Sequence, residues 1–387
     1  MARMKDDTKL CHDARPSLGV RMVNPSVERG STVLFNSYDS FVAKNRPMYY
    51  GRHGTSIHTE LKKAVGLLEG GDNVTLTSSG LSAINLTLAT FAEPGADILV
   101  TDTAYDPVRS FCDFYLAPRG VSIRYFDPLI GEGIKDLIRD ETVLIHTESP
   151  GSLTFELQDL PAIRAGAGDL PISIDNTWGA GYFYKPLALG ATISIQSATK
   201  YMGGHSDVFL GTICSANDTV GRRIARTATL LGNATSPDDA YQILRGLRTL
   251  PTRLREHETQ GIALAQWLDA RPEVARVIHP ALESHPQHAL FRRDFTGASA
   301  LFSVILQTGD EAYTRAFIDA LSLYGLGYSW GGYESLCLPA WPSRSRTAVP
   351  WEETGQLLRF HVGLEAIEDL TADLANAFET AGRETVR

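Results

Sequence analysis

The chain has 387 residues, of which 43% are hydrophobic and 21% are charged; this composition is close to the globular average and excludes a mainly disordered protein. Its 36 basic and 45 acidic side chains give a formal net charge of −9, which argues against nucleic acid as the main partner. No apolar run approaches the roughly 18 residues of a membrane span, and the polar start lacks the apolar stretch of a signal peptide, so we expect no membrane association.

The first 55 residues read as an irregular arm, and a helix is expected next, from Ile57 to Glu69. Short apolar runs then alternate with helix-like stretches, which is typical of βαβ units and a mainly parallel sheet covered on both faces. A long helix from Asp239 to Glu258, kinked at Pro251, is expected to link a large domain to a smaller C-terminal one. The expected strands are 73–77, 97–101, 121–126, 142–147, 171–175 and 192–196, with later strands at 299–306 and 357–365.

Polar and aromatic residues gather where these strands end. Tyr105 follows the second strand, Asp175 ends the fifth and Lys200 follows the sixth. Ligands bind outside the carboxyl ends of the strands in open α/β sheets, so we expect the site at this edge. Ser78-Ser79-Gly80 lies between the first strand and a helix that starts near Leu81, and backbone N–H groups at such a helix start bind phosphate.

Together these residue types describe a pyridoxal phosphate site. A lysine amine such as that of Lys200 can form a Schiff base with a carbonyl, and the hydroxyls of Ser197 and Thr199 can bind phosphate. The Asp175 carboxylate can keep a ring nitrogen protonated, and Tyr105 can stack on the ring. Each feature has a plainer alternative: a helix cap, a surface lysine or a capped turn. Their joint occurrence in this order favours the cofactor.

Segments spread over the chain carry a family pattern. Among them are YYGRHGT (49–55), LEGGDNVTLTSSGLSAI (68–84), TDTAYDP (101–107), IDNTWGAGYFYKPL (174–187), SIQSATKYMGGHSD (194–207), YSWGGYESL (328–336) and LLRFHVGLEAIEDLTADL (357–374). With them the sequence resembles the Cys/Met-metabolism family of pyridoxal-phosphate enzymes from about residue 20 to the end. The resemblance implies an α/β protein of PLP-dependent transferase fold type I (aspartate-aminotransferase-like), with a mainly parallel seven-stranded sheet and a smaller C-terminal α+β domain.

The resemblance also implies a role for each site residue. It makes Lys200 the Schiff-base lysine, Asp175 the carboxylate on the pyridine nitrogen and Tyr105 the stacked aromatic, and these three are the expected catalytic residues. It places Arg359 on the substrate α-carboxylate, which suits a bidentate guanidinium. The implied phosphate contacts are Ser79, Gly80, Leu81, Ser197 and Thr199, with Tyr50 and Arg52 reaching the phosphate of a neighbouring subunit, and Ser329 and Trp330 beside the lysine and substrate.

The domain organisation and assembly follow from the same resemblance. We expect an N-terminal arm, residues 1–55, that contributes to a neighbouring subunit's site, a PLP-binding large domain, 56–245, and a small domain, 246–387. The resemblance implies a homotetramer built from two active dimers, acting on a small-molecule amino acid. The four cysteines lie far apart and form no C-x-x-C, so we expect no metal site and no disulfide framework, and a cytoplasmic location.

Two places distinguish the subfamilies. Ser329-Trp330-Gly331-Gly332 stands where γ-acting relatives carry S-L-G-G, and Thr55-Ser56-Ile57 stands where they carry N-P-T. Both differences favour the subfamily of bacterial cystathionine β-lyases, carbon–sulfur lyases of methionine biosynthesis. Their α,β-elimination converts L-cystathionine to homocysteine, pyruvate and ammonia.

Other functions stay open at this point. One is a γ-acting enzyme: a cystathionine γ-synthase, cystathionine γ-lyase or methionine γ-lyase. Another is a broad-specificity cysteine-S-conjugate β-lyase, and a third is a cofactor-binding regulator without activity. The chain has His53 where the β-lyases carry a second arginine, and it lacks their acidic residue near Ser110. Those positions face the far end of the substrate, so the resemblance leaves the thioether open.

Overall fold

The computed structural model describes residues 4–12, 22–43 and 48–384. A seven-stranded sheet forms the centre of the larger domain, and its strands run in the order β1-β7-β6-β5-β4-β2-β3. Its strands are β1 (Asn73–Thr77), β2 (Asp97–Thr101), β3 (Ser122–Phe126), β4 (Thr142–Glu148), β5 (Ile172–Asp175), β6 (Ile193–Ser197) and β7 (Gly211–Ser215). The six strands expected in this region are confirmed to within two residues at each end, and the seven-stranded sheet is confirmed.

Strand direction brings the functional edge together. β2, β3, β4, β5 and β6 are parallel in their pairings, whereas β7 runs antiparallel to both β1 and β6. Two antiparallel steps restore the direction, so β1 points the same way as β6. The carboxyl ends of β1, β2, β4, β5 and β6 therefore meet at one edge of the sheet.

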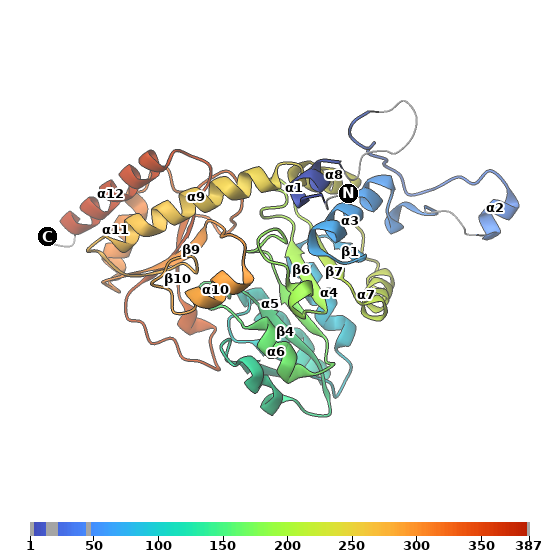
Figure 1. Cartoon of the computed structure of the whole chain (residues 1–387), viewed down its shortest axis with the longest axis horizontal. Coiled ribbons are helices and arrows are strands. Elements are labelled where there is room, and N and C mark those ends of the chain that lie inside the picture. The colour runs from blue at the N-terminus through green and yellow to red at the C-terminus, as the bar shows by residue number, and fades with distance from the viewer. Residues whose placement is uncertain (1–3, 13–21, 44–47, 385–387) are drawn as a thin grey trace.

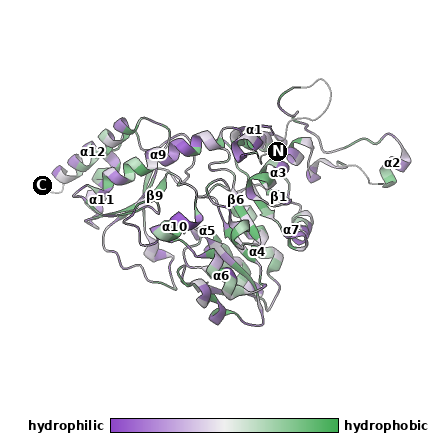
Figure 2. Ribbon diagram, viewed as in Figure 1, coloured by the Kyte–Doolittle hydropathy of each residue, from purple (hydrophilic) through white to green (hydrophobic). Residues whose placement is uncertain are grey.

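Helices cover this sheet, and Figure 1 shows them packed around the strands. The α4 helix is largely hydrophobic in Figure 2, because it is covered by the sheet on one side and by α5 and α7 on the other. The α7 helix, with one face in solvent, is mostly hydrophilic. The helices of this part are α3 (Ser56–Glu69), α4 (Gly80–Phe91), α5 (Asp106–Phe111), α6 (Leu160–Ala167), α7 (Asp218–Leu230) and α8 (Pro237–Leu247). Short 3-10 or π turns are η1 (Gly51–His53), η2 (Cys112–Leu116), η3 (Ala117–Arg119), η4 (Gly131–Leu137) and η5 (Pro186–Leu189).

A second, antiparallel sheet of four strands, in the order β10-β11-β9-β8, forms the smaller C-terminal domain. Its strands are β8 (Val274–Ile278), β9 (Leu301–Leu306), β10 (Leu336–Ala340) and β11 (Leu357–His361). The strand expected at 357–365 ends at His361, since the chain turns away into the α12 helix. The remaining elements are α9 (Leu250–Asp269), α10 (His288–Asp294), α11 (Glu311–Ala320), η6 (Pro342–Arg344) and α12 (Ile367–Glu384).

The prediction of a single helix at 239–258 is wrong. Two helices, α8 and α9, meet at Arg248 and Thr249, and Pro251 lies in the first turn of α9 rather than at a kink. Proline is well tolerated there because the first N–H groups of a helix have no intrahelical partner. The α9 helix then runs from the larger domain to the smaller one (Figure 1).

The N-terminal arm contains α1 (Asp6–His12), which lies against the body, and α2 (Tyr38–Ala43), which extends away from it in Figure 1. The arm exposes large apolar side chains: Leu34 is 88% exposed, Tyr38 79% and Phe41 59%. Within the described ranges, none of the helices has the length and apolar character needed to cross a bilayer.

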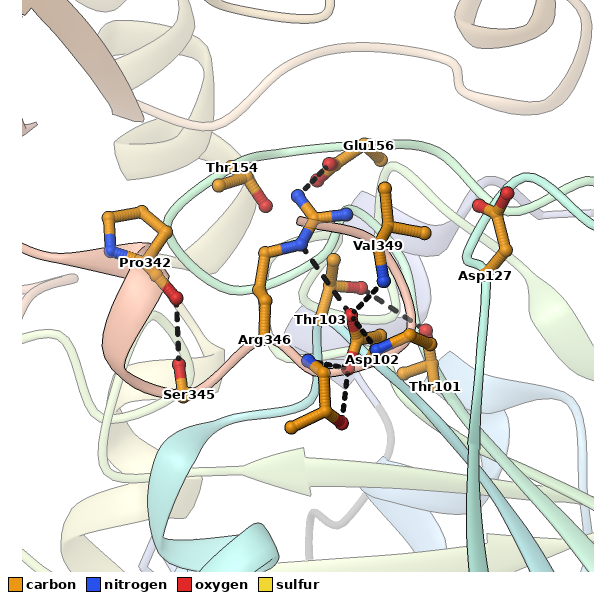
Figure 3. A network of polar contacts seen from close by, with 12 residues as sticks. Thr101, Asp102, Thr103, Asp127, Thr154, Glu156, Pro342, Ser345, Arg346 and Val349 are labelled. Carbon is orange, nitrogen blue, oxygen red and sulfur yellow. Dashed lines mark hydrogen bonds and ion pairs between the residues drawn. The ribbon is translucent and has the colours of Figure 1, made fainter. Parts of the chain in front are cut away.

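A buried carboxylate ties the two domains together beside the site (Figure 3). Asp102, directly after β2, accepts hydrogen bonds from the backbone N–H groups of residues 347–349 at 2.9–3.0 Å and from Arg109 Nη2 at 2.6 Å. Arg346 lies 3.7 Å from the same carboxylate and pairs with Glu156 at 2.6 Å. Burial alone would raise the pKa of Asp102, but the backbone N–H groups and the Arg109 charge outweigh it, so this pKa lies below its ordinary 3.8.

This network predicts an acid-sensitive contribution to stability. Asp102→Asn leaves two nearly buried guanidinium groups without their shared counter-charge, so we expect the free energy of unfolding at pH 7 to fall by about 3 kcal/mol. The folded-state pKa of Asp102 is lowered, so its contribution is complete above the unfolded pKa and is lost as the pH falls through the folded value. Urea unfolding should therefore show the difference between wild type and variant shrinking below about pH 4. The exposed Asp127, changed to Asn, is the control and should shift stability by less than about 0.5 kcal/mol.

Candidate active site

A cavity of about 240 Å³ opens at the carboxyl edge of the large sheet, between the two domains. Ten of the thirteen residues predicted for the site line it: Ser79, Gly80, Leu81, Tyr105, Asp175, Ser197, Thr199, Lys200, Trp330 and Arg359. The other wall residues include Glu148, Thr177, Trp178, Phe209 and Tyr328. The strand-end rule thus predicted where the cavity lies.

One end of the cavity has the character of an anion cradle. Ser79 caps α4, its Oγ accepting from Ser82 N at 3.1 Å, so the simple helix-cap interpretation of this residue is also correct. The first N–H groups of α4, at Gly80 and Leu81, have no intrahelical partner, and both residues line the cavity. A Cβ on Gly80 would lie 2.4 Å from Ser197 Cβ, so glycine is what allows the helix start to approach β6 this closely.

Asp175 is held in place by the residue two positions later. Thr177 donates its backbone N–H, at 2.9 Å, and its hydroxyl, at 2.5 Å, to Asp175 Oδ1. The same hydroxyl accepts from Ser197 N at 2.8 Å, which joins the ends of β5 and β6. Both hydrogen bonds that the described residues make to the carboxyl group end on Oδ1, so Oδ2 is left to the cavity. Burial raises the pKa of Asp175, while Thr177 and the Lys200 charge oppose the rise.

Lys200 projects from the turn after β6 toward the smaller domain. Its Nζ donates to Ser329 Oγ at 2.7 Å and lies 5.3 Å from the centre of the Trp330 ring. Burial, with the Arg359 charge in second place, lowers the pKa of Lys200 to about 8, although Asp175 opposes this. A substantial neutral fraction near physiological pH makes this amine a usable nucleophile and base. Ser329, predicted beside the lysine, is brought there.

Arg359 reaches the cavity from β11 of the smaller domain. Its Nη2 donates to the backbone oxygens of Tyr328, at 2.6 Å, and Ser329, at 3.0 Å. Its Nε is buried without a hydrogen-bond partner, and no Asp or Glu of the described residues forms an ion pair with it. Burial lowers its pKa to about 10, which leaves the guanidinium charged at neutral pH. An unsatisfied buried cation of this kind fits an anionic ligand.

Sequence reasoning missed Glu148, the last residue of β4. Its Oε2 accepts the backbone N–H of Tyr105 at 2.7 Å, and its side chain lines the cavity. The same strand-end position that identified Asp175 could have found it. Burial, the largest cause, raises the pKa of the Tyr105 phenol, and the Arg359 charge opposes it; the net shift is upward, so the phenol keeps its proton at neutral pH.

Tyr50 and Arg52, predicted to serve a neighbouring subunit, do not line this cavity. They lie on the arm at η1, where the Arg52 guanidinium carbon is 5.6 Å from the Tyr50 ring centre. Arg52 instead borders a separate cavity with His53, His58 and Lys62. The role of Tyr50 and Arg52 at a neighbouring subunit's site stays a prediction.

The residues that are present fit pyridoxal phosphate. An anion cradle, a carboxylate with one oxygen open to the cavity, an amine of lowered pKa and an unpaired guanidinium converge here. The fold and this cavity define a PLP-dependent enzyme of fold type I.

The comparisons with known proteins make the class specific. Residues 7–379 match the family described as Cys/Met metabolism PLP-dependent enzyme, and the chain belongs to that family. It is 42% identical to the cystathionine beta-lyase of Salmonella typhimurium, over 96% of this chain and 98% of that protein. It is 41% identical to cystathionine beta-lyase MetC of Escherichia coli, over 98% and 99% of the two chains. A solved cystathionine gamma synthase from Xanthomonas oryzae pv. oryzae, in complex with cystathionine, superimposes with a TM-score of 0.90 at 31% identity, over 99% and 100%.

The contact between Gly80 and Ser197 generates a prediction about cofactor retention. In Gly80→Ala the new Cβ would also lie 2.8 Å from Ser197 Cα, so the helix start or the end of β6 must move. Overpacking of this kind costs about 1–3 kcal/mol, and we expect at least about a tenfold weaker hold on pyridoxal phosphate, measured by absorbance after dialysis. Gly382→Ala, where nothing lies within 4 Å of the added Cβ, should retain the cofactor as wild type does. Equal retention in both variants would contradict the prediction.

Proposed function

We propose that this chain is a carbon–sulfur β-lyase that releases homocysteine, pyruvate and ammonia from L-cystathionine. The observation that carries the proposal is the convergence of Lys200, Asp175 and Arg359 in one cavity, with Trp330 as its wall. The identity of about 40% to proteins named cystathionine beta-lyases supports the choice of reaction. A regulator without activity would not need an amine of lowered pKa beside an unpaired guanidinium.

The residues divide the work by position. Lys200 would hold the cofactor covalently, Asp175 would face its ring nitrogen, and Ser79, Gly80, Leu81, Ser197 and Thr199 would hold its phosphate. When bound, pyridoxal phosphate supplies an electron sink for the pair left at the substrate Cα. Arg359 would bind the substrate α-carboxylate with its guanidinium, whose Nε–H has no partner in the protein. With a pKa of about 8, the released Lys200 amine is suited to take the α-proton.

The leaving sulfur needs a proton, and two residues can supply it. The Tyr105 phenol is protonated at neutral pH, because burial raises its pKa. Lys200 carries the proton taken from Cα and can pass it on. Stacking of the Tyr105 ring on the cofactor is compatible with proton transfer from either residue. The hydrogen bond from the Tyr105 backbone N–H to Glu148 holds the backbone of Tyr105 in place.

Trp330 supports β- over γ-elimination. Its indole lies over Lys200 and packs edge-on against Tyr201, at 5.4 Å between ring centres, which fixes a bulky wall beside the amine. γ-Chemistry requires a second proton abstraction, at Cβ, and so more room for the substrate to reorient. The thioether itself is part of the proposal, because His53 and Ser110 depart from the subfamily.

We propose further that the active unit is a dimer, and that two dimers form a tetramer. The arm exposes apolar side chains that a second copy of the chain could cover, and it carries Tyr50 and Arg52. The proposed parts are the arm, 1–55, the PLP-binding domain, 56–245, and the small domain, 246–387; the second boundary falls at the end of α8. A cytoplasmic location is proposed on the three buried free thiols, which suit a reducing compartment.

Arg359→Lys tests carboxylate recognition. The variant keeps the charge but loses the planar fork, and loss of a charged hydrogen-bonded pair costs about 2–5 kcal/mol, so kcat/KM for L-cystathionine should fall at least about thirtyfold. Cofactor absorbance should survive. The exposed Arg344, changed to Lys, is the control and should keep wild-type kinetics. A folded Arg359→Lys enzyme with unchanged kcat/KM would refute the role.

Shared sites predict complementation between two inactive chains. Arg52→Ala removes the side chain that the arm would contribute to a neighbouring chain, and Lys200→Ala removes the Schiff-base lysine from the chain's own cavity. If the arm of one chain completes the site of another, mixed dimers contain one intact site and should recover up to about a quarter of the wild-type activity. Labelled subunits must be shown to exchange; exchange without recovered activity would count against the shared site.

The reaction class is tested by its products. With L-cystathionine we expect pyruvate and homocysteine, identified by chromatography of the keto acid and thiol. Dominant 2-oxobutyrate and cysteine would overturn the β-lyase proposal. Trp330→Leu tests the cause: enlarging the cavity beside Lys200 should raise the share of 2-oxobutyrate. An unaltered product ratio and rate would leave the class standing and remove Trp330 as its explanation.

A further inference from the structure

Two carboxyl groups end neighbouring strands at the cavity. The parallel pairing of β4 and β5 places Glu148 directly opposite Asp175, and both side chains line the cavity wall. Like charges this close in a water-poor wall disfavour ionisation of both, so a pair of this kind retains a proton on one member. The surrounding hydrogen bonds decide which member.

The donors favour an ionised Asp175. Its Oδ1 accepts two hydrogen bonds from Thr177, and a carboxylate accepts such bonds more strongly than a neutral acid does. The Glu148 carboxyl group receives a single hydrogen bond from the described residues, the backbone N–H of Tyr105. A neutral carboxylic acid can accept that one bond at Oε2 and still has an O–H group to donate.

The charges facing the pair act in the same direction. The groups that converge on it are the Tyr105 phenol after β2, the Lys200 amine after β6 and the Arg359 guanidinium from β11. The Lys200 charge stabilises the ionised form of Asp175. The negative charge of Asp175 in turn disfavours the ionised form of Glu148. Burial first and then Asp175 raise the pKa of Glu148 well above its ordinary value, and the Tyr105 N–H opposes them only in part.

We propose that Glu148 is a carboxylic acid in the resting holoenzyme, a positioning residue that accepts the Tyr105 N–H at Oε2 and presents its own O–H to the cavity. Asp175 is then the sole anion of this wall, reserved for the ring nitrogen. Glu148 fixes the Tyr105 backbone without adding a second negative charge beside the phenol. The inference rests on the proposed cofactor pocket and is independent of which thioether is the substrate.

Infrared spectroscopy of the holoenzyme tests the proton directly. A protonated carboxyl group has a C=O stretch separate from that of a carboxylate, and the wild type minus Glu148→Gln difference at pH 7 should contain one such band. Glu69 is a second buried carboxyl group whose pKa is raised by burial, so Glu69→Gln is the matched control and should remove a different band. A difference spectrum with no carboxylic-acid band would overturn the proposal.

The neutral isostere gives a second readout. In Glu148→Gln the pH midpoint of the cofactor absorbance should move by less than about 0.3 unit, because the substitution replaces one neutral group by another. If Glu148 were ionised, removing its charge would lower that midpoint by about one unit or more, which would overturn the assignment. Glu148→Ala, which loses the acceptor for the Tyr105 N–H, should reduce kcat/KM at least about tenfold.

If Glu148→Gln does not fold, the Glu69→Gln holoenzyme carrying glutamate labelled with ¹³C at the side-chain carboxyl takes its place. An isotope-shifted carboxylic-acid band supports the proposal, and its absence overturns it. These spectra do not depend on turnover, so failure of the β-lyase proposal, seen as the wrong keto acid, remains distinguishable from failure of this one.

Discussion

Because six of the seven strands of the large sheet point the same way, residues far apart in the chain arrive at one edge with their side chains beside one another. β2, β4, β5 and β6 bring Tyr105, Glu148, Asp175 and Lys200 there, and β1 leads to the start of α4. β1 points the same way as β6 because β7, which lies between them, is antiparallel to both. The catalytic arrangement is therefore a consequence of sheet topology, and the loops that follow the strands supply only the final placement.

Burial is what turns these side chains into a reactive set. The same removal from water raises the pKa of the carboxyl groups and of the Tyr105 phenol, and lowers the pKa of Lys200 and Arg359. Burial thereby favours the neutral form of every group, and the hydrogen-bond partners and neighbouring charges decide which groups stay ionised. Thr177 does this for Asp175, whereas Arg359 resists because its ordinary pKa is so high.

Sequence reasoning reached the sheet and most of the cavity because apolar runs and strand ends are local signals. It did not predict β7, because the segment Gly211–Ser215 consists largely of small and polar residues. It also did not predict β10, because this strand contains Pro339, which a sheet tolerates here since β10 lies at its edge. The strand-end position of Glu148 is visible in the sequence, but nothing local indicates which carboxylate is its neighbour. That neighbour, Asp175, is 27 residues away and is set by the register of β4 and β5.

The smaller domain completes the site through Arg359, whose guanidinium group has two separate functions. Arg359 uses Nη2 to hold the backbone at Tyr328 and Ser329, and Ser329 Oγ in turn accepts from Lys200. Its Nε remains without a partner beside the cavity. Only a planar fork with donors on separate edges can shape the segment next to the lysine and still offer donors to an anion. Carboxylate recognition and placement of the lysine are thus coupled in one residue, and the Asp102 network holds the two domains in the relation that this coupling requires.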